Sequence, residues 1–225
     1  LPTLRTGQEQ PIHFPTVCPV CQSELYKPEE EAVWRCINVE CPAQVVERII
    51  HFVSKDAMDI RSFGEQQVRK FYELGLLRDI AGVYQLNLEA IGRLEGFGTK
   101  SIANLQQAIE QSKKQPLYRL IYALGIRHVG ETTAKTLARA ITHILELGAK
   151  TAEQLMQLED IGPKVANSIV HFFSNPHHVH LLKKKKKLGV TVSQGADAMA
   201  IKKGGAFAGK SFLFTGTLSQ LKRSQ

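Results

Sequence analysis

Four cysteines lie within one 24-residue window of the sequence, in the pattern C-x2-C-x14-C-x4-C. Each half of this pattern is typical of a tight turn that offers two thiolates, and two such turns can close a tetrahedron around Zn²⁺. The predicted site is structural, because four protein ligands leave no open position for water or substrate. Its predicted ligands are Cys18, Cys21, Cys36 and Cys41.

The alternatives to zinc are two disulfides or four unrelated thiols. Disulfides are disfavoured because nothing in the sequence marks the chain as secreted, and unrelated thiols would not cluster in this way. A module this small cannot build a core, so metal binding should supply most of its folding free energy. Val33 and Trp34 are expected to add a little apolar cover between the two turns.

Four glycines recur along the rest of the chain at intervals of 34, 32 and 32 residues: Gly64, Gly98, Gly130 and Gly162. Each lies between a short apolar segment and an amphipathic helical one, which is the helix–hairpin–helix arrangement. A fixed period of this length indicates one supersecondary unit used repeatedly. Since each unit has an apolar stripe to bury, we predict one all-α domain of four helix–hairpin–helix motifs over residues 43–188. The predicted fold class is therefore mainly α, with the small zinc finger in front.

These hairpins suit an anionic partner. Glycine lets the backbone approach a ligand closely, and the following helix presents unpaired N–H groups there. Such groups contact phosphates and read no base edge, so binding should ignore DNA sequence. The alternative is that each glycine only caps a helix. The predicted DNA-binding residues are Gly96, Gly98, Thr99, Lys100, Gly125, Gly130, Thr132, Thr133, Gly162 and Lys164.

The four hairpins are not expected to contribute equally. In the first, Ser62 with Glu65 has the form of a capping box, and the Glu65 carboxylate would repel phosphate. The fourth hairpin has Asp160 at the position that corresponds to Gly96. We therefore expect the second and third hairpins to dominate DNA contact and the first to be mainly structural.

Several local signals place the surrounding elements. Pro42 begins a predicted helix that leaves the cysteine window. Thr151 with Gln154 three residues later has the form of a capping box. Asn175 and Pro176 mark the start of a basic helix. That helix contains five consecutive lysines, which are typical of a solvated face or a linker.

The composition limits the possible partners. The 225 residues include 29 Lys and Arg against 21 Asp and Glu, a formal net charge of +8, which makes acidic partners plausible. No stretch approaches ~18 consecutive apolar residues, and no basic and apolar leader opens the sequence. We expect a soluble intracellular chain, and because it begins with Leu1, a piece of a larger protein.

The order of these features resembles the C-terminal half of a bacterial NAD⁺-dependent DNA ligase. The resemblance is carried by CPVC, WRCINVECPAQVVERIIHF, LYALGIRHVGETTA, LEDIGPKVA and GKSFLFTGTLSQL. It implies that residues 1–16 are a linker or the end of a preceding OB-fold domain, and that residues 17–42 are a zinc finger. Residues 189–208 would then be a linker, and residues 209–225 the truncated start of a BRCT domain.

The resemblance also implies a function. This chain would be the DNA-binding portion of an enzyme that seals nicks in duplex DNA during replication and repair. The family uses NAD⁺ and Mg²⁺, with a catalytic lysine in a K-x-D-G motif that does not occur in this chain. We therefore expect no catalytic residue here and no activity of this piece alone. The implied partners are nicked duplex DNA and the nucleotidyltransferase and OB-fold domains of the same protein, in the bacterial cytoplasm, with no membrane.

Two other function classes are compatible with parts of the sequence. One is a stand-alone helix–hairpin–helix adaptor that binds DNA structures in recombination or repair. The other is a zinc-dependent RNA-binding protein, which the lack of interleaved surface aromatics argues against. The finger in front and the Thr-Gly strand behind favour the ligase.

Overall fold

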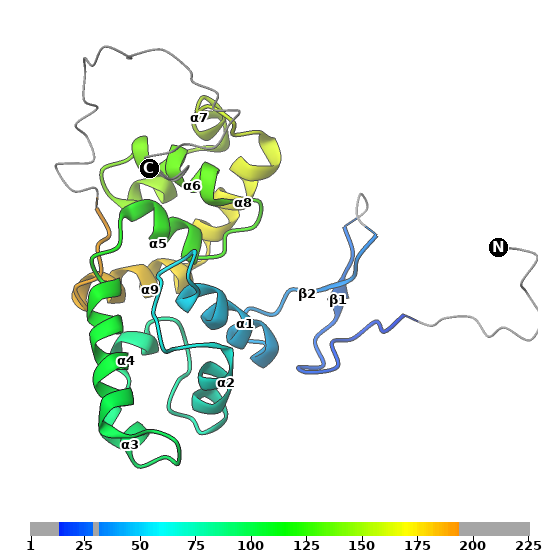
Figure 1. Cartoon of the computed structure of the whole chain (residues 1–225). Helices are drawn as coiled ribbons and strands as arrows, with labels where there is room; N and C mark the ends of the chain where they lie inside the picture. The colour runs from blue at the N-terminus through cyan, green and yellow to red at the C-terminus, as the bar shows by residue number, and fades with distance from the viewer. Residues whose placement is uncertain (1–13, 29–31, 194–225) are drawn as a thin grey trace, which may run out of the picture. The chain divides into compact units, whose positions relative to one another are not determined.

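The structure is a computed structural model that describes residues 14–28 and 32–193. The expected tail at residues 1–13 and the expected BRCT strand at 209–225 lie outside these residues, as does most of the expected linker. The elements run in the order β1 (Leu25–Tyr26), β2 (Arg35–Cys36), α1 (Pro42–Val53), α2 (Glu65–Glu73), η2 (Gly82–Gln85), α3 (Leu88–Gly92), α4 (Thr99–Ser112), α5 (Leu117–Ala123), α6 (Glu131–Arg139), η3 (Ile144–Ala149), α7 (Ala152–Met156), α8 (Pro163–Ser174) and α9 (Pro176–Lys187) (Figure 1). The predicted class, mainly α after a four-cysteine module, is confirmed. Within the described part of the chain, no helix is long and apolar enough to span a membrane.

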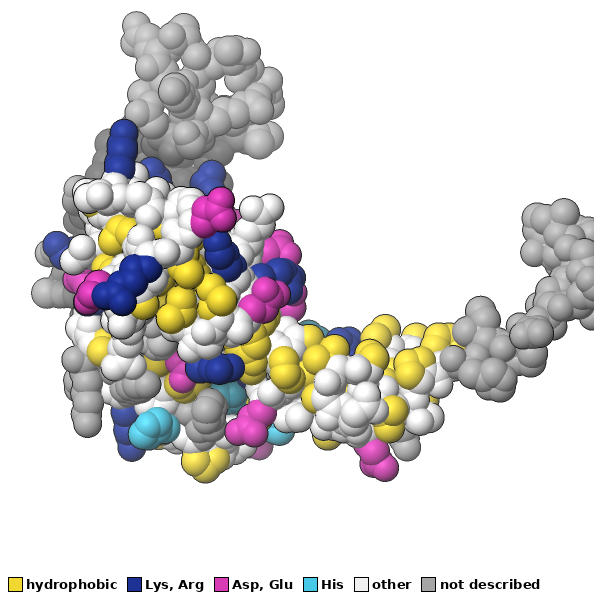
Figure 2. All heavy atoms as spheres, turned by 90° about the horizontal axis from the view of Figure 1, so that it is seen from below, with side chains coloured by type: hydrophobic (Ala, Val, Ile, Leu, Met, Phe, Trp, Pro, Cys, Tyr) yellow, Lys and Arg dark blue, Asp and Glu magenta, His cyan; other side chains and the backbone are white. Residues whose placement is uncertain are grey.

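The finger has almost no apolar interior. Its two strands have two residues each and pair antiparallel, with Leu25 opposite Cys36. Val33 and Trp34 are 55% and 40% exposed, so the expected apolar cover is wrong. A two-residue ladder has no face broad enough to cover these side chains, and Figure 2 shows hydrophobic side chains at the surface of the finger.

Helix α1 connects the finger to the helical domain. Its N-cap is Cys41 and its first residue is Pro42, whose missing N–H is no loss at that position. Side chains of α1 also reach back to the finger: Gln44 donates to the Cys36 carbonyl and Arg48 donates to the Val39 carbonyl. Further along, α1 buries an apolar face in the helical core, so one helix belongs to both modules.

The four hairpins share one backbone conformation. We number them first to fourth by Gly64, Gly98, Gly130 and Gly162, each of which is the extended N-cap of the next helix. The residue two positions earlier has a positive φ in every case: Ser62 (59°), Gly96 (87°), His128 (64°) and Asp160 (60°). The residue directly before each glycine points into the core and is buried or half-buried: Phe63, Phe97, Val129 and Ile161. The repeat seen in the sequence is therefore a repeat of turn geometry.

One contiguous apolar core runs through the helical domain. Around the first two hairpins it is aromatic: the Phe71 ring lies 5.5 Å from that of Phe63 and 5.4 Å from that of Phe97. The α1 side chain of His51 bonds to the carbonyl of Tyr122 at 2.9 Å. These contacts hold α1, α2 and α5 together beneath the hairpin turns.

One of the two expected capping boxes is present. Around α7, the Thr151 N–H donates to Gln154 at 3.0 Å, and the Gln154 N–H donates to the Thr151 hydroxyl at 3.3 Å. The expected box of Ser62 with Glu65 is wrong, because Ser62 lies in the turn and the N-cap of α2 is Gly64, two residues later. Burial of Phe63 fixes that register, and Gln67 accepts the N–H of the true N-cap at 3.1 Å.

The predicted basic helix is α9, and the helical domain continues beyond it. Val190 and Val192 are buried in the core. Between them, the Thr191 N–H donates to the carbonyl of Lys113 at 2.9 Å. The domain therefore includes residues up to at least 193, five residues later than the boundary expected from composition.

Candidate functional site

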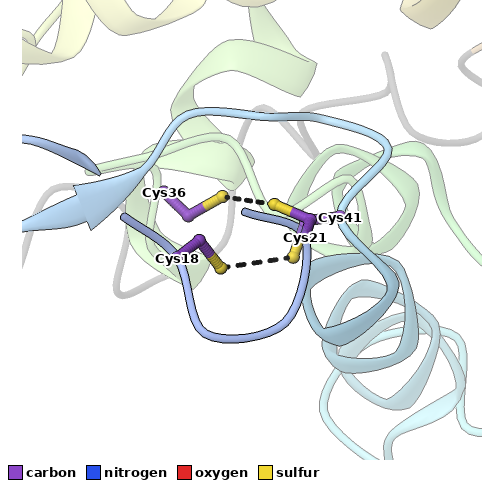
Figure 3. Close-up of side chains that lie close together, drawn as sticks. All are labelled: Cys18, Cys21, Cys36 and Cys41. Carbon is purple, nitrogen blue, oxygen red and sulfur yellow. Dashed lines mark hydrogen bonds between the residues drawn. The ribbon is translucent and has the colours of Figure 1, made fainter. Parts of the chain in front are cut away.

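The structure brings the four cysteines together as the sequence predicts. Their sulfurs all lie within 4.8 Å of one another (Figure 3). The Sγ atoms of Cys18 and Cys41 are 4.0 Å apart, and those of Cys21 and Cys36 are 3.5 Å apart. A regular tetrahedron with zinc–sulfur distances of ~2.3 Å has edges of about 3.8 Å. The four thiols are free, so the donor set and its spacing support structural zinc.

Hydrogen bonds and burial act in opposite directions on two of these thiols. Bonds with Ser23, through its hydroxyl and then its backbone, lower the pKa of Cys21 to about 6. Burial raises the pKa of Cys36 to about 12. Zinc binds cysteine as the thiolate, so metal binding at these four thiols would release protons.

Two polar residues that the sequence analysis did not identify hold the cysteine turns. The Asn38 amide donates to the Ser23 hydroxyl at 3.1 Å, which links the second turn to the first. The Asn38 side chain also accepts the Glu40 N–H at 2.9 Å, and its carbonyl accepts the Cys41 N–H at 3.1 Å. The only signal in the sequence is a polar residue two positions after Cys21 and another two after Cys36.

Three of the hairpin glycines are not required by the protein itself. Gly98, Gly130 and Gly162 have extended backbones that any residue can adopt, and an added Cβ would meet nothing within 4 Å. They provide no side chain to cap the next helix, whereas Asn87 and Thr151 cap α3 and α7. The N-caps of α4, α6 and α8 therefore provide no side-chain acceptor for the first amides of these helices, and in α8 the first residue, Pro163, has no N–H.

Two other glycines differ from these three. At Gly64 an added Cβ would meet the Gln67 side chain at 3.3 Å, and the same side chain accepts the glycine N–H. Gly125 lies at the end of α5 with a φ of 65, and its N–H donates to the Tyr122 carbonyl. The Gly125 amide is therefore used within its own helix turn, so this residue is poorly placed to bind phosphate.

The polar side chains predicted to contact DNA lie at the starts of three helices. Thr99, Lys100, Thr132 and Lys164 are exposed, and Thr133 is half-buried. Figure 2 shows Lys and Arg side chains mixed with Asp and Glu on the face in view, without one continuous basic patch. The positive charge is distributed over separate hairpins.

Two family models match the chain. The model for the NAD-dependent DNA ligase C4 zinc finger domain matches residues 17–43, which include all four cysteines. The model for the helix–hairpin–helix motif matches residues 119–182, which include the third and fourth hairpins. Both matches coincide with the two regions whose geometry is described above.

Curated relatives match nearly the whole chain. A DNA ligase from Sulfurihydrogenibium azorense is 53% identical over 98% of this chain and 31% of its own length. A DNA ligase from Persephonella marina is 52% identical over 97% of this chain and 30% of its own length. A DNA ligase from Aquifex aeolicus is 48% identical over 98% of this chain and 30% of its own length. The chain thus spans about a third of the length of these relatives. Together with the matched finger, this similarity shows that the chain belongs to the NAD-dependent DNA ligase family and contains its C4 zinc finger and helix–hairpin–helix region.

Proposed function

We propose that this chain is the part of an NAD⁺-dependent DNA ligase that holds the backbone of duplex DNA without reading its sequence. The observation that carries the proposal is the set of three helices, α4, α6 and α8, that begin after exposed glycines at which an added Cβ would meet nothing within 4 Å, and that have no side-chain cap. A phosphate oxygen can approach such an N-terminus, accept hydrogen bonds from its amides and benefit from the positive end of the helix dipole.

Side chains would complete each phosphate site. Thr99 and Lys100 follow the second glycine, Thr132 and Thr133 follow the third, and Lys164 follows the fourth. Hydroxyls donate one hydrogen bond each, and ammonium groups add charge that amides lack. At the second hairpin, the positive φ of Gly96 turns the chain before Gly98 and so helps to position the phosphate site.

The whole protein would seal nicks in duplex DNA, with NAD⁺ and Mg²⁺ used by domains outside this chain. The residues described here hold no K-x-D-G lysine, so adenylation would occur in a nucleotidyltransferase domain of the same protein. The finger would fix the angle between a preceding OB-fold domain and the hairpins. The alternative, a stand-alone adaptor, is not favoured, because the relatives that match 97–98% of this chain are named DNA ligases.

DNA binding by this chain should depend steeply on salt. If it contacts about five phosphates, the logarithm of the binding constant should fall against the logarithm of salt concentration with a slope of about −4 to −5. The measurement is a titration of a fluorescent duplex at several salt concentrations. Duplexes of unrelated sequence serve as the control and should give the same slope, and a flat salt response would contradict the proposal.

Replacing Gly130 with serine should separate stability from DNA binding. Serine is a good N-cap and the site has room for it, so we expect the free energy of unfolding to stay equal or rise by a few tenths of a kcal/mol. DNA affinity should fall, because the new hydroxyl takes the amides that would bind phosphate.

The matched control is Gly96→Ser, which places a side chain at a φ of 87 and should cost about 1–2 kcal/mol of stability. Denaturant unfolding and duplex titration measure the two quantities for both variants. A Gly130→Ser protein that binds DNA as tightly as the parent would show that the amides of α6 do not contact phosphate.

A further inference from the structure

The four hairpins are of two kinds, and the kinds alternate along the chain. Residues 60–65 read IRSFGE and residues 126–131 read IRHVGE. Residues 94–100 read LEGFGTK and residues 158–164 read LEDIGPK. The position before the positive-φ residue is thus arginine in the first and third hairpins and glutamate in the second and fourth. A lysine follows the glycine at the second helical position only in the second and fourth.

The secondary structure also repeats after every second hairpin. The elements α2, η2, α3 and α4 are followed, after α5, by α6, η3, α7 and α8 in the same order. Helices α3 and α7 have five residues each, and both are capped by a side chain. The chain therefore contains a duplicated two-hairpin unit, which we call unit one (residues 60–112) and unit two (residues 126–174). The matched helix–hairpin–helix region at 119–182 covers unit two.

Within unit one, the two hairpins form a common surface. They line a groove of about 480 Å³. The first hairpin contributes Ser62, Gln66 and Lys70 to this groove, and the second contributes Gly96, Ser101 and Asn104. Since the first hairpin shares a hydrogen-bonding surface with the second, its place in the fold is more than that of a buried support.

The glutamate that follows the glycine in the first and third hairpins is neutralised locally. Glu65 lies 2.8 Å from Arg69, and Glu131 lies 2.6 Å from Lys135, each four residues along the helix. The bond from Lys135 also lowers the pKa of Glu131. The ion pair should weaken the repulsion of phosphate expected from Glu65, and the same argument applies to Glu131 in the third hairpin.

Four exposed cations occupy matching places in the two units. Arg61 and Arg127 precede the turn of the first hairpin in each unit, and Lys100 and Lys164 follow the glycine of the second. All four residues are exposed, and the Arg61 side chain is 82% exposed, 3.7 Å from Asp59. Because the position before the turn is acidic in the second hairpin, a phosphate would meet that hairpin from its helix side and the first hairpin from its turn side.

We propose that the two units hold the DNA backbone in the same way, each through the arginine of its first hairpin and the lysine of its second. This inference rests on the proposed DNA-binding function and refines it. It makes the first hairpin a DNA contact equal to the third, in place of the mainly structural role expected from the sequence.

The test compares paired charge-removing variants of the full chain. Variant one is Arg61→Gln with Lys100→Gln, and variant two is Arg127→Gln with Lys164→Gln. Each should reduce the magnitude of the salt slope by about 2, one for each lost phosphate contact, with equal losses of affinity. The charge-keeping replacements Arg61→Lys and Arg127→Lys should retain the parent slope, and circular dichroism checks the fold of every variant.

The matched control removes two exposed cations, Lys114→Gln just beyond the C-terminus of α4 and Arg139→Gln at the last residue of α6, and should leave the slope nearly unchanged. A loss of slope in variant two, with variant one behaving like the control, would overturn the equivalence of the units and leave DNA binding intact. If both variants behave like the control, the contacts lie elsewhere and the inference fails. A parent protein with no salt-dependent binding would instead overturn the proposed function itself.

Discussion

Replacing Cys36 with serine should release zinc and unfold the finger, while the helical domain keeps its structure. Three thiolates remain, but the hydroxyl of serine is a poor zinc ligand. Zinc binding supplies on the order of 10–16 kcal/mol in small fingers of this kind. The finger has no substitute for that energy, because its strands have two residues each and Trp34 is 40% exposed. The core beneath α1 contains no finger residue and should not respond.

The chain offers a selective reporter for this experiment. Trp34 is its only tryptophan, so intrinsic tryptophan fluorescence reports the finger, while far-ultraviolet circular dichroism reports the helices. Bound zinc should fall to near zero in Cys36→Ser. Tryptophan fluorescence should change, and far-ultraviolet circular dichroism should change little. The control is Glu24→Gln, an exposed finger residue outside the cysteine set, which should keep its zinc. Retention of full zinc content by Cys36→Ser would show that the assigned ligand set is incorrect.

Replacing Phe71 with alanine should cost about 3–5 kcal/mol of the free energy of unfolding, the usual loss for a buried phenylalanine. Phe71 is fully buried, with its ring 5.5 Å from that of Phe63 and 5.4 Å from that of Phe97. Those two rings belong to the residues directly before Gly64 and Gly98, so the cavity would lie beneath two hairpin turns at once. Loss of order in the first two hairpins should accompany the loss of stability.

The matched control for Phe71 lies on the next turn of the chain. Leu74 is 51% exposed, so Leu74→Ala should change stability by less than about 0.5 kcal/mol. Urea unfolding followed by circular dichroism measures both variants. A loss of less than about 1 kcal/mol for Phe71→Ala would mean that the core closes over the missing ring, contrary to the packing described here.

The features that the sequence predicts well are those in which residue type and spacing directly determine geometry. The spacing from Cys18 to Cys41 leaves few arrangements other than two facing turns, and all four sulfurs meet. The period of Gly64, Gly98, Gly130 and Gly162 predicts the hairpins, because each glycine directly precedes the first residue of a helix. Which side chains would touch DNA stays a prediction, because it depends on a partner outside the chain.

Other features depend on packing that no short pattern reveals. Ser62 and Glu65 have the spacing of a capping box, but burial of Phe63 sets a different register. Val190 and Val192 follow a glycine in a segment of mixed composition, where two apolar residues give no periodic signal, and both are buried. The glycine period of 32 to 34 residues does not reveal that the hairpins alternate, because it makes all four turns look alike. The arginines and lysines beside the turns repeat at twice that distance.

The segment after α9 has a mechanical consequence. The Thr191 N–H and hydroxyl both donate to the Lys113 carbonyl at the end of α4, at 2.9 and 2.8 Å. One residue later, the Val192 carbonyl accepts the N–H of Ile144, at the start of η3, at 2.9 Å. A pull transmitted along the chain from beyond Ser193 would therefore reach α4 and η3 together. Tension would be shared between the two halves of the helical domain, and would load these three hydrogen bonds before it reached α9.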